Sequence, residues 1–548
     1  MTALPSRTSV LIAGGGPVGL AAAVELGRRG IPCAVVEPRE EVSRARPRCK
    51  TLNVRTMEHL RRWGIADRLR ERAPLPVEWS QSIVFCTSLT GHELSRFDGV
   101  LGLAADGDRF PELGQQAPQF VLEDLLREVV DELPSCSLVR GARVGQITQD
   151  GTSVRAEITE SSGQRMVVSA DYLIGCDGPR STVRDQIGAH YVGEQALRPN
   201  FGMVFTAPAL AAQVTHGRAV QYWVVNERAP ALLGPLDKDG TWWMIAFGVD
   251  AEQGASDGSE LIDAAVGTHV DATILSTDPW TAHMQCVDHL RDGRVFLAGD
   301  AAHLNPPFGG HGLNTGIGDA VDLGWKLAAV LQGWGGADLL DSYELERRPV
   351  QERVIAEAAQ NNSVLSTELT APNLDDDDDD DEAGGRSRQA AHDRIQQTKH
   401  AEFHALDLVL DIRHDESPVM ARDDTGQADL VGARLPHVWL GPGRSIYDTL
   451  GDGFTLIVLT GDPSVTAPMV DAARTRGVPL AVVDLGGTGL REHYGTDALL
   501  VRPDQYVAWH GDVSAMGVLE VGAVLDRVRG ASQHDHLPAV PAGNGALS

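Results

Sequence analysis

The sequence predicts a multidomain α/β protein, and three observations carry this prediction. The chain has 548 residues, which at about 150 residues per domain allows three or four domains. Hydrophobic residues make up 42% of it, aromatic residues only 5%, and 59 residues are glycine, a composition typical of α/β cores with many tight turns. A strand, helix, strand pattern opens the chain, and strand-like runs recur as far as residue 485. A peptide module, a disulfide-stapled miniprotein and wholesale disorder are excluded.

The N-terminal pattern is a βαβ unit. Residues 9–13 are a continuous apolar run, residues 17–29 have helical spacing, and residues 33–37 are apolar again. A second helix is expected over about 55–72. The periodicity therefore predicts a Rossmann-like start to the fold.

A GxGxxG motif joins the first strand to the helix. Gly14 permits a tight turn, Gly16 lets the backbone approach a diphosphate, and Gly19 allows the helix to pack on the strand. Pro17 opens the helix, whose N-terminus presents the positive end of its dipole to the diphosphate. Glu37 ends the second strand, where its carboxylate can accept hydrogen bonds from a ribose and would repel a 2′-phosphate. The motif predicts one tightly held FAD or NAD, and not NADP.

Sheet-rich segments interrupt this first domain. Turn residues cluster between 79 and 116, and strand-like runs such as QYWVVN (221–226) and TWWMIAFGV (241–249) lie within 188–285. We expect the two segments to form one inserted, sheet-rich substrate domain.

The second half of the chain adds a strand at 294–299, a helix at 318–332 and, after residue 430, a further α/β domain. Between them the sequence is polar and contains an acidic run at 375–382, which is expected to be solvated and mobile. The predicted domains are 1–78, 117–187 and 286–360 for the dinucleotide, 79–116 and 188–285 for the substrate, a linker at 361–428, a C-terminal domain at 429–530 and a flexible tail at 531–548.

Charge and cysteine usage narrow the partners and the compartment. Lys and Arg number 47 against 76 Asp and Glu, so the formal net charge is −29, which disfavours nucleic acid and membrane-surface partners. The six cysteines form no CxxC pair and no metal-ligand spacing, so we expect no metal site and reduced cytosolic thiols. A signal peptide and an apolar stretch of about 18 residues are both missing, which predicts a cytoplasmic protein.

Two later segments add a family resemblance. Residues 170–184 read ADYLIGCDGPRSTVR, and residues 294–322 read RVFLAGDAAHLNPPFGGHGLNTGIGDAVD. Together with the GxGxxG motif, in this order, they resemble the FAD-dependent aromatic hydroxylases, the single-component flavoprotein monooxygenases typified by p-hydroxybenzoate hydroxylase. The stretch 430–510 is similar to the thioredoxin-like C-terminal domain of the phenol, dichlorophenol and polyketide hydroxylase branch. That stretch contains no cysteine, so thiol redox exchange is excluded for it.

The resemblance implies an activity. FAD would be tightly bound, NADPH or NADH would reduce it as a transient co-substrate, and dioxygen would form a flavin hydroperoxide that hydroxylates a phenolic or related electron-rich aromatic compound. A flavin-dependent dehydrogenase or reductase on the same fold is the alternative, and an inactive flavin-binding interaction protein is a third class. The expected partners are a small aromatic substrate and, as a possible assembly, a second copy of the chain.

The resemblance also assigns cofactor residues. Asp300 matches the aspartate that binds the ribityl chain, and Asp177 with Gly178 matches a motif that touches FAD and the visiting nicotinamide. Arg48 and Gln119 match side chains near the diphosphate and ribityl, and Arg39 and Val144 fall near adenine or its ribose. The full predicted cofactor set is Gly14, Gly16, Pro17, Gly19, Glu37, Arg39, Arg48, Gln119, Val144, Asp177, Gly178, Asp300, Pro307, Gly309, Gly310, Gly312, Leu313 and Asn314.

The loop 306–314 is expected to face the flavin ring. Its glycines let the backbone lie flat against the ring, and the N–H groups of Leu313 and Asn314 would stabilise negative charge on the reduced flavin. His311 stands where glutamine is usual in the branch. Its ring could change charge near neutral pH and link flavin potential to pH, or it could be a neutral spacer in solvent.

The substrate-activating group is left open by the sequence. Lys50, Tyr222 and His311 are the catalytic candidates, against the competing interpretation of a surface lysine and a strand tyrosine. Trp223, Trp242 and Trp243 could line an apolar pocket or belong to the core. We therefore expect a base or a hydrogen-bond acceptor near the substrate hydroxyl without identifying it.

Overall fold

The computed structural model describes residues 4–45, 50–195, 197–375, 382–422, 430–462 and 466–531. Arg48, the acidic residues 376–381 and nearly all of the predicted tail lie outside the described residues. Two compact units make up the chain: Met1–Gly324 with Arg347–Ile412 and Pro436–Asp448, and Trp325–Glu346 with Arg413–Leu435 and Thr449–Ser548.

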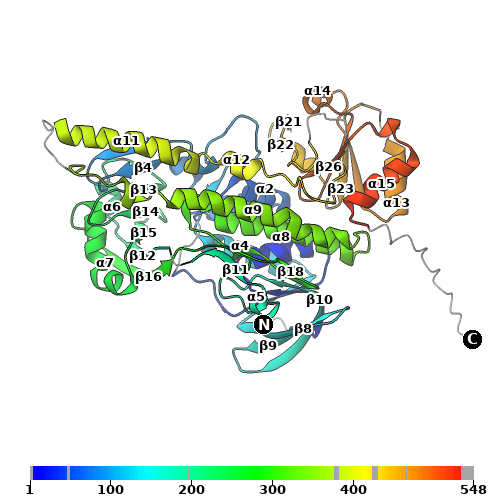
Figure 1. Ribbon diagram of the computed structural model, residues 1–548, viewed down its shortest axis with the longest axis horizontal. Coiled ribbons are helices and arrows are strands. Elements are labelled where there is room, and N and C mark those ends of the chain that lie inside the picture. The colour runs from blue at the N-terminus through cyan, green and yellow to red at the C-terminus, as the bar shows by residue number, and fades with distance from the viewer. Residues whose placement is uncertain are drawn as a thin grey trace, which may run out of the picture. The chain divides into compact units, whose positions relative to one another are not determined.

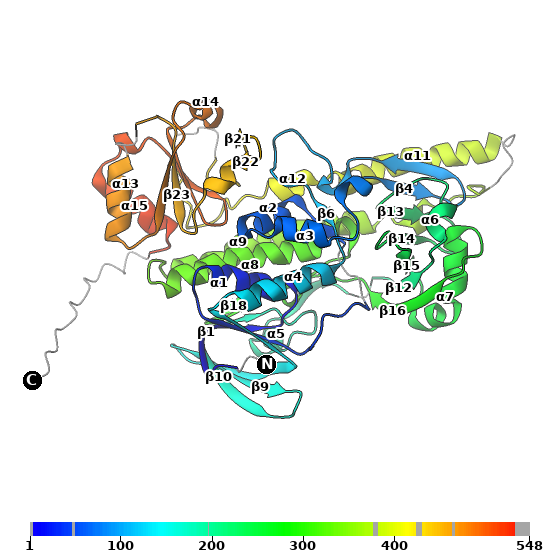
Figure 2. The same ribbon diagram turned by 180° about the vertical axis from the view of Figure 1, so that it is seen from behind.

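An eight-stranded, mostly parallel sheet forms the base of the first unit (Figures 1 and 2). The strand order is β18 (Arg291–Asp292), β19 (Val295–Leu297), β10 (Arg165–Gly175), β1 (Arg7–Ala13), β2 (Cys33–Glu37) and β7 (Cys136–Arg140). In addition, β9 (Val154–Glu160) pairs with β10, and β8 (Ala142–Gln149) pairs with β9. β2 is buried at every position, as a central parallel strand requires. Helices α1 (Pro17–Arg28) and α4 (Gln119–Glu132) pack against each other and against this sheet, so the predicted βαβ unit is present.

A seven-stranded sheet carries the inserted segments. Its order is β16 (Thr273–Thr281), β12 (Pro199–Thr206), β15 (Thr241–Phe247), β14 (Ala231–Pro235), β13 (Gln221–Val224), β4 (Ile83–Cys86) and β5 (Glu93–Phe97). β4 pairs with β13, so the segments 79–116 and 188–285 share one sheet. Tyr222 packs on one face with α7 (Ala251–Val266), and Trp223 packs on the other with α11 (Glu382–Phe403).

Three regions differ from the expected elements. The helix expected over 55–72 is broken into α2 (Val54–Trp63) and α3 (Ala66–Arg72), because Gly64 ends the first with φ of +75°. The helix expected from 318 begins earlier, as α8 (His311–Leu331). The described part of the expected linker is largely helical, and α11 packs on β5, because a few apolar side chains such as Ile395 and Phe403 bury against the distant sheet.

The second unit has its own four-stranded mixed sheet. The order is β24 (Leu480–Asp484), β23 (Phe454–Val458), β25 (Ala498–Val501) and β26 (Val507–Gly511), and α13 (Ala467–Thr475) packs on α15 (Val518–Val528). This is the separate α/β domain that the sequence predicts after residue 430.

The long helix α9 (Asp338–Asn362) follows α8. The remaining helices and strands are short, and they are α5 (Thr182–Gln186), α6 (Leu210–Gln213), α10 (Ser366–Leu369), α12 (Leu406–Leu410), α14 (Leu490–Tyr494), β3 (Thr51–Leu52), β6 (Gln115–Gln116), β11 (Tyr191–Glu194), β17 (Met284–Val287), β20 (His303–Leu304), β21 (Trp439–Gly441) and β22 (Arg444–Ser445). Within the described ranges, every helix is too short or too polar to cross a bilayer.

Candidate active site

The turn between β1 and α1 has the geometry that a diphosphate needs. Gly14 has φ of +102°, and a Cβ on it would lie 2.3 Å from the carbonyl oxygen of Cys176. A Cβ on Gly19 would lie 2.0 Å from the Gly14 carbonyl oxygen, so the helix can pack this closely only as glycine. At Gly16, where Pro17 starts α1, a Cβ would meet no described atom within 4 Å. The turn thus leaves space at a helix N-terminus, which fits an anionic group.

The end of β2 gathers three predicted cofactor residues. Glu37 is 3% exposed and accepts hydrogen bonds from Gly15 N and from Arg39 Nε, each at 2.7 Å. The Arg39 guanidinium also lies 3.4 Å from the carboxylate of Glu123, which accepts a hydrogen bond from the Gln119 amide at 2.6 Å. Sequence reasoning missed Glu123, although its place one turn after Gln119 on α4 was a usable signal. Burial raises the pKa of Glu123.

Asp300 stands beside the start of α1. It follows β19 in a short 3-10 turn and is exposed. Gly299 before it has φ of +62°, and a Cβ there would lie 2.9 Å from the Val18 side chain on α1. The Tyr191 hydroxyl donates a hydrogen bond to the Asp300 carbonyl oxygen. A dinucleotide with its diphosphate at α1 could therefore place its sugar chain at Asp300.

A buried ionic cluster supports this turn. Asp319 on α8 accepts hydrogen bonds from Gly299 N at 3.2 Å and from Arg347 Nε at 2.8 Å, and its carboxylate lies 3.0 Å from His303 Nε2. Burial acts to raise the pKa of Asp319, but Arg347 and His303 lower it to about 2. Sequence reasoning missed this residue, and the signal was an acid inside an otherwise apolar helix, GIGDAVDLGW.

The predicted flavin-facing loop is held by Asn314. Gly309 and Gly310 have φ of +79° and +70°, and α8 begins directly after them. The Asn314 side chain accepts a hydrogen bond from Asn53 N at 3.0 Å and donates one to the Gly310 carbonyl oxygen at 2.6 Å. Leu313 lies in the same first turn of α8. The side chain of Asn314 therefore fixes the loop.

His311 is packed beneath this loop. Its ring is 5% exposed, and a Cβ on Gly309 would lie 2.4 Å from its Nε2 atom. Burial lowers the pKa of His311 to about 4. The buried ring is thus not a spacer in solvent, and its lowered pKa argues against a change of charge near neutral pH. Pro307 lies directly before the 3-10 turn Phe308–Gly310 within this loop. A Cβ on Gly312 would lie 3.2 Å from the Asn305 side-chain oxygen.

Three further predicted cofactor residues are Asp177, Gly178 and Val144. The Asp177 carboxylate accepts hydrogen bonds from Thr182 Oγ1 and from Val183 N, each at 3.2 Å, so it stabilises the start of α5. Gly178 beside it has φ of +82° and open space around it. Val144 lies on β8 with its side chain buried.

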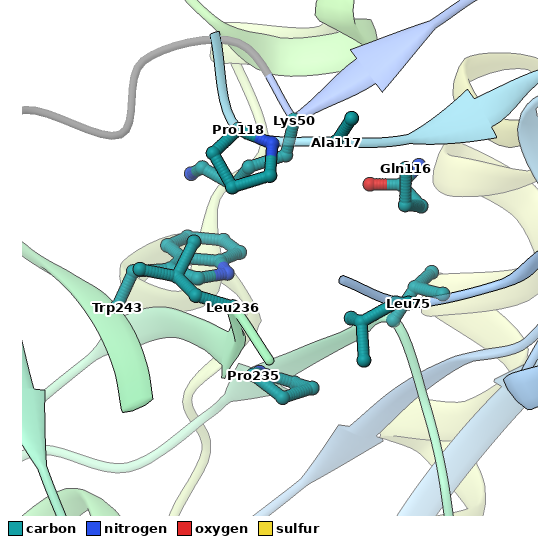
Figure 3. A pocket seen from close by; sticks show the side chains of 9 residues that line it. Lys50, Leu75, Gln116, Ala117, Pro118, Pro235, Leu236 and Trp243 are labelled. Carbon is teal, nitrogen blue, oxygen red and sulfur yellow. The ribbon is translucent and has the colours of Figure 1, made fainter. Parts of the chain in front are cut away.

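An apolar pocket brings Lys50 and Trp243 together (Figure 3). Its lining residues are Lys50, Leu75, Gln116, Ala117, Pro118, Val220, Pro235, Leu236 and Trp243. Lys50 Nζ lies 3.1 Å from the centroid of the Trp243 ring. The Lys50 carbonyl oxygen accepts a hydrogen bond from Ala117 N at 2.7 Å, which joins the two chain segments at one wall. Pro118 leads directly into Gln119 and α4.

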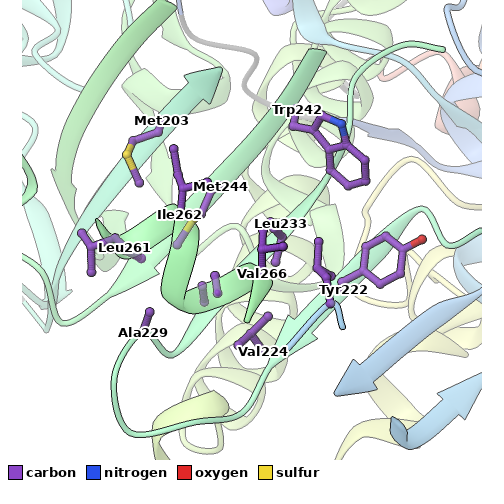
Figure 4. Close-up of a cluster of buried hydrophobic side chains, with 14 of the residues drawn as sticks. Met203, Tyr222, Val224, Ala229, Leu233, Trp242, Met244, Leu261, Ile262 and Val266 are labelled. Atoms are coloured by element: carbon purple, nitrogen blue, oxygen red, sulfur yellow. The ribbon is translucent and has the colours of Figure 1, made fainter. Parts of the chain in front are cut away.

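Tyr222 belongs to the core and not to this pocket. Its ring lies among apolar side chains of the inserted sheet and α7 (Figure 4). Its hydroxyl accepts a hydrogen bond from Ala219 N at 2.9 Å and donates to the Gly217 carbonyl oxygen. Burial raises the pKa of Tyr222 to about 12. Among the three catalytic candidates, the pocket lining includes only Lys50.

Comparison with protein families gives two matches along the chain. Residues 7–358 match the family described as FAD binding domain, and residues 428–532 match the family described as aromatic-ring hydroxylase, C-terminal. A putative polyketide hydroxylase of Streptomyces halstedii is 33% identical, over 92% of this chain and 93% of the relative. A 2,4-dichlorophenol 6-monooxygenase of Delftia acidovorans is 31% identical, over 92% of this chain and 94% of the relative.

Solved structures agree with these matches. The rebeccamycin biosynthetic enzyme RebC with reduced flavin superposes with a TM-score of 0.87 at 34% identity, covering 96% of this chain and 100% of that one. The flavin-dependent monooxygenase PieE in complex with FAD and substrate gives 0.87 at 31% identity, with the same coverage. The glycine turn, Glu37 and Asp300 fit an FAD of the kind that these structures hold.

Proposed function

The chain belongs to the FAD-dependent aromatic-ring hydroxylases, and from this premise we propose that the pocket at Lys50 and Trp243 receives the aromatic ring that the enzyme oxygenates. The protein is a flavin-dependent monooxygenase. No finding supports the dehydrogenase or the inactive binding protein.

The observation that carries the proposal is the ammonium of Lys50 at the wall of an apolar pocket. Its Nζ atom lies 3.1 Å from the Trp243 ring centroid, a cation–π arrangement that holds the charge in place. A positive charge near a bound phenol favours its phenolate, because an opposite charge within about 4–6 Å stabilises the ionised form. Lys50 would thus increase the electron density of the ring that is to be attacked.

The names of the relatives leave the size of the substrate open, because they include a polyketide hydroxylase and a dichlorophenol monooxygenase. The charge of Lys50 beside Trp243 fits a substrate with an ionisable hydroxyl. We therefore propose a phenolic substrate.

The chain's own residues would bind and orient the cofactor. FAD, reduced by NADPH or NADH, supplies the chemistry that activates dioxygen. The turn at Gly14–Gly19 would hold its diphosphate, Glu37 its ribose, and Asp300 its ribityl chain. Asp319 would keep the Asp300 turn in position through Gly299 N.

Substitution of Lys50 by Met tests this role. We expect it to weaken the binding of phenol and 2,4-dichlorophenol by about tenfold, the effect of losing one charge-assisted contact of about 1.4 kcal/mol, with FAD occupancy unchanged. The control is Lys238→Met, because Lys238 is exposed on the turn between β14 and β15, the strand that carries Trp243. Binding is measured by the change in flavin absorption, and equal affinities in both variants would contradict the proposal.

A cytoplasmic location and a homodimer remain predictions from the sequence. Fractionation of cells and light scattering of the purified chain would test them. Neither bears on the pocket.

A further inference from the structure

The C-terminal end of α11 lies against the predicted flavin-facing loop. α11 contacts the 3-10 turn Phe308–Gly310. Trp223 links the two elements, because its ring centroid lies 6.0 Å from that of Phe308 and 6.2 Å from that of Phe403. A segment that the sequence assigns to a linker therefore touches the loop that would carry the cofactor.

This end of α11 buries a charged pair. Lys399 and Glu402 are 0% and 1% exposed. Lys399 Nζ donates a hydrogen bond to Glu402 Oε2 at 2.7 Å and another to the Asn361 carbonyl oxygen at 3.0 Å, and it lies 4.9 Å from the Trp223 ring centroid. Apolar residues of similar size often replace such pairs without loss of stability, so packing alone does not explain them.

The pair is only half satisfied. Within the described residues, Glu402 Oε1, Asn361 Nδ2 and Trp223 Nε1 are buried and make no hydrogen bond. Such atoms point to a functional role or to bound water, because most buried polar atoms in proteins are paired. Burial raises the pKa of Glu402, whereas Lys399 and the backbone N–H of Gly309 lower it.

We propose that Glu402 is a positioning residue for the flavin-facing loop, with its carboxyl group directed at the backbone of Gly309 and held there by Lys399. The inference rests on the proposed placement of FAD against residues 307–314. The charge of Glu402 then sets how Gly309 is held, and the loop transmits that state to the flavin ring.

The groups around Glu402 come from four elements. Lys399 is on α11, Glu357 is on α9 and acts to raise the Glu402 pKa, and the 3-10 turn presents the Gly309 N–H. On α8, the His311 ring packs against Gly309 and is neutral near pH 7 because its pKa is lowered to about 4. Ionisation of Glu402 would therefore strengthen the attraction between its carboxyl group and the Gly309 N–H.

The test compares the holoenzyme with Glu402→Gln and with Asp393→Asn, an exposed acid on the same helix. Absorption of the oxidised flavin is recorded from about pH 4.5, the usual carboxyl pKa, to about pH 8. We expect a single-proton transition in the wild type and in Asp393→Asn that Glu402→Gln lacks. We also expect FAD to dissociate from Glu402→Gln with a Kd about fivefold higher, the equivalent of one weakened hydrogen bond.

Two results would overturn the inference. One is a wild-type flavin spectrum that does not change over this range, which needs no variant to fold. The other is a transition that persists in Glu402→Gln. Either result would leave the hydroxylase function intact, whereas a folded wild type that binds no FAD would instead refute the proposed function.

Discussion

Two buried Lys–Glu pairs, one in each unit, differ in how fully their oxygens are satisfied. In the second unit, Glu346 accepts two hydrogen bonds from Arg502 at 2.8 Å, one from Lys326 at 2.8 Å and one from Ser417 at 2.6 Å. In the first unit, Glu402 accepts one from Lys399, and its Oε1 has no partner among the described residues.

The pKa shifts of the two acids differ in direction for this reason. Burial acts to raise both, but Arg502 and Lys326 hold the pKa of Glu346 well below its usual value. Glu402 is paired with the single cation Lys399, and its pKa stays above the usual value. The number of cations and donors, and not burial, therefore separates a charge that serves stability from one that can respond to pH.

The largest expected effect is on Glu346. Glu346→Gln removes the carboxylate that pairs with the buried Lys326 and, beside Asp504, with Arg502, so the free energy of unfolding should fall by about 3–5 kcal/mol near pH 7. Because the folded pKa is lowered, this stabilisation is present above the usual carboxyl pKa and should shrink as the pH falls below about 4.5. Urea unfolding measures it, and Asp471→Asn, an exposed acid paired with Arg474, is the control. If Glu346→Gln were as stable as Asp471→Asn, Glu346 would not stabilise the fold and would not differ from Glu402 in this respect.

Asp319→Asn should come next. Loss of the charge weakens the contact with Arg347 and the acceptor for Gly299 N, so we expect about 1–3 kcal/mol less stability and about tenfold weaker FAD binding. FAD titration measures the second effect. Asp171→Asn, in a surface pair with Arg7, should leave FAD affinity unchanged. If Asp319→Asn and Asp171→Asn bound FAD equally well, Asp319 would have no part in holding the cofactor.

Glu402→Gln takes the charged acceptor from the buried Lys399, which keeps the Asn361 carbonyl oxygen, so we expect a loss of about 1–2 kcal/mol of stability. Since the folded pKa of Glu402 is raised, its contribution is present at low pH and is lost as the pH rises through that value. The variant cannot ionise and should gain stability relative to the wild type between about pH 5 and about pH 8. The urea midpoints of the variant and the wild type at both pH values measure this change. A variant that loses stability relative to the wild type at the higher pH would contradict the raised pKa of Glu402.

The smallest effect is expected for His311→Gln. With a pKa lowered to about 4, His311 is neutral from pH 6 upwards. Its replacement by the residue usual in the branch should therefore leave the pH profile of FAD binding unchanged over about pH 6–8. FAD titration at several pH values checks this, and a profile that flattens in the variant would restore the histidine as a proton-linked group.

Local signals predicted the dinucleotide half of the fold well. The expected strand at 33–37 is β2, and the expected helix from Pro17 is α1, because glycine turns and apolar periodicity are encoded within a few residues. α11 could not be predicted in this way. Its buried side chains are sparse along the sequence, and the surface that covers them comes from β5, about 300 residues earlier.

The same division applies to the site. Motif spacing predicted Glu37, which ends β2, and the family resemblance predicted Asp300, which lies in the 3-10 turn after β19. Asp319, Glu123 and Glu402 were missed because each acts through contacts made only after folding. Lys50 and Tyr222 were equal candidates in the sequence. Only folding separates them, because Lys50 lies before β3 at the pocket wall, whereas the ring of Tyr222 on β13 packs in the core.

A crystal structure of the FAD-loaded protein tests the central claim most directly. We predict a diphosphate at the turn Gly14–Gly19, the ribityl chain at Asp300, and the flavin ring along residues 307–314, with the pocket at Lys50 and Trp243 open to that ring. A diphosphate bound elsewhere, or a pocket separated from the ring by protein, would contradict it.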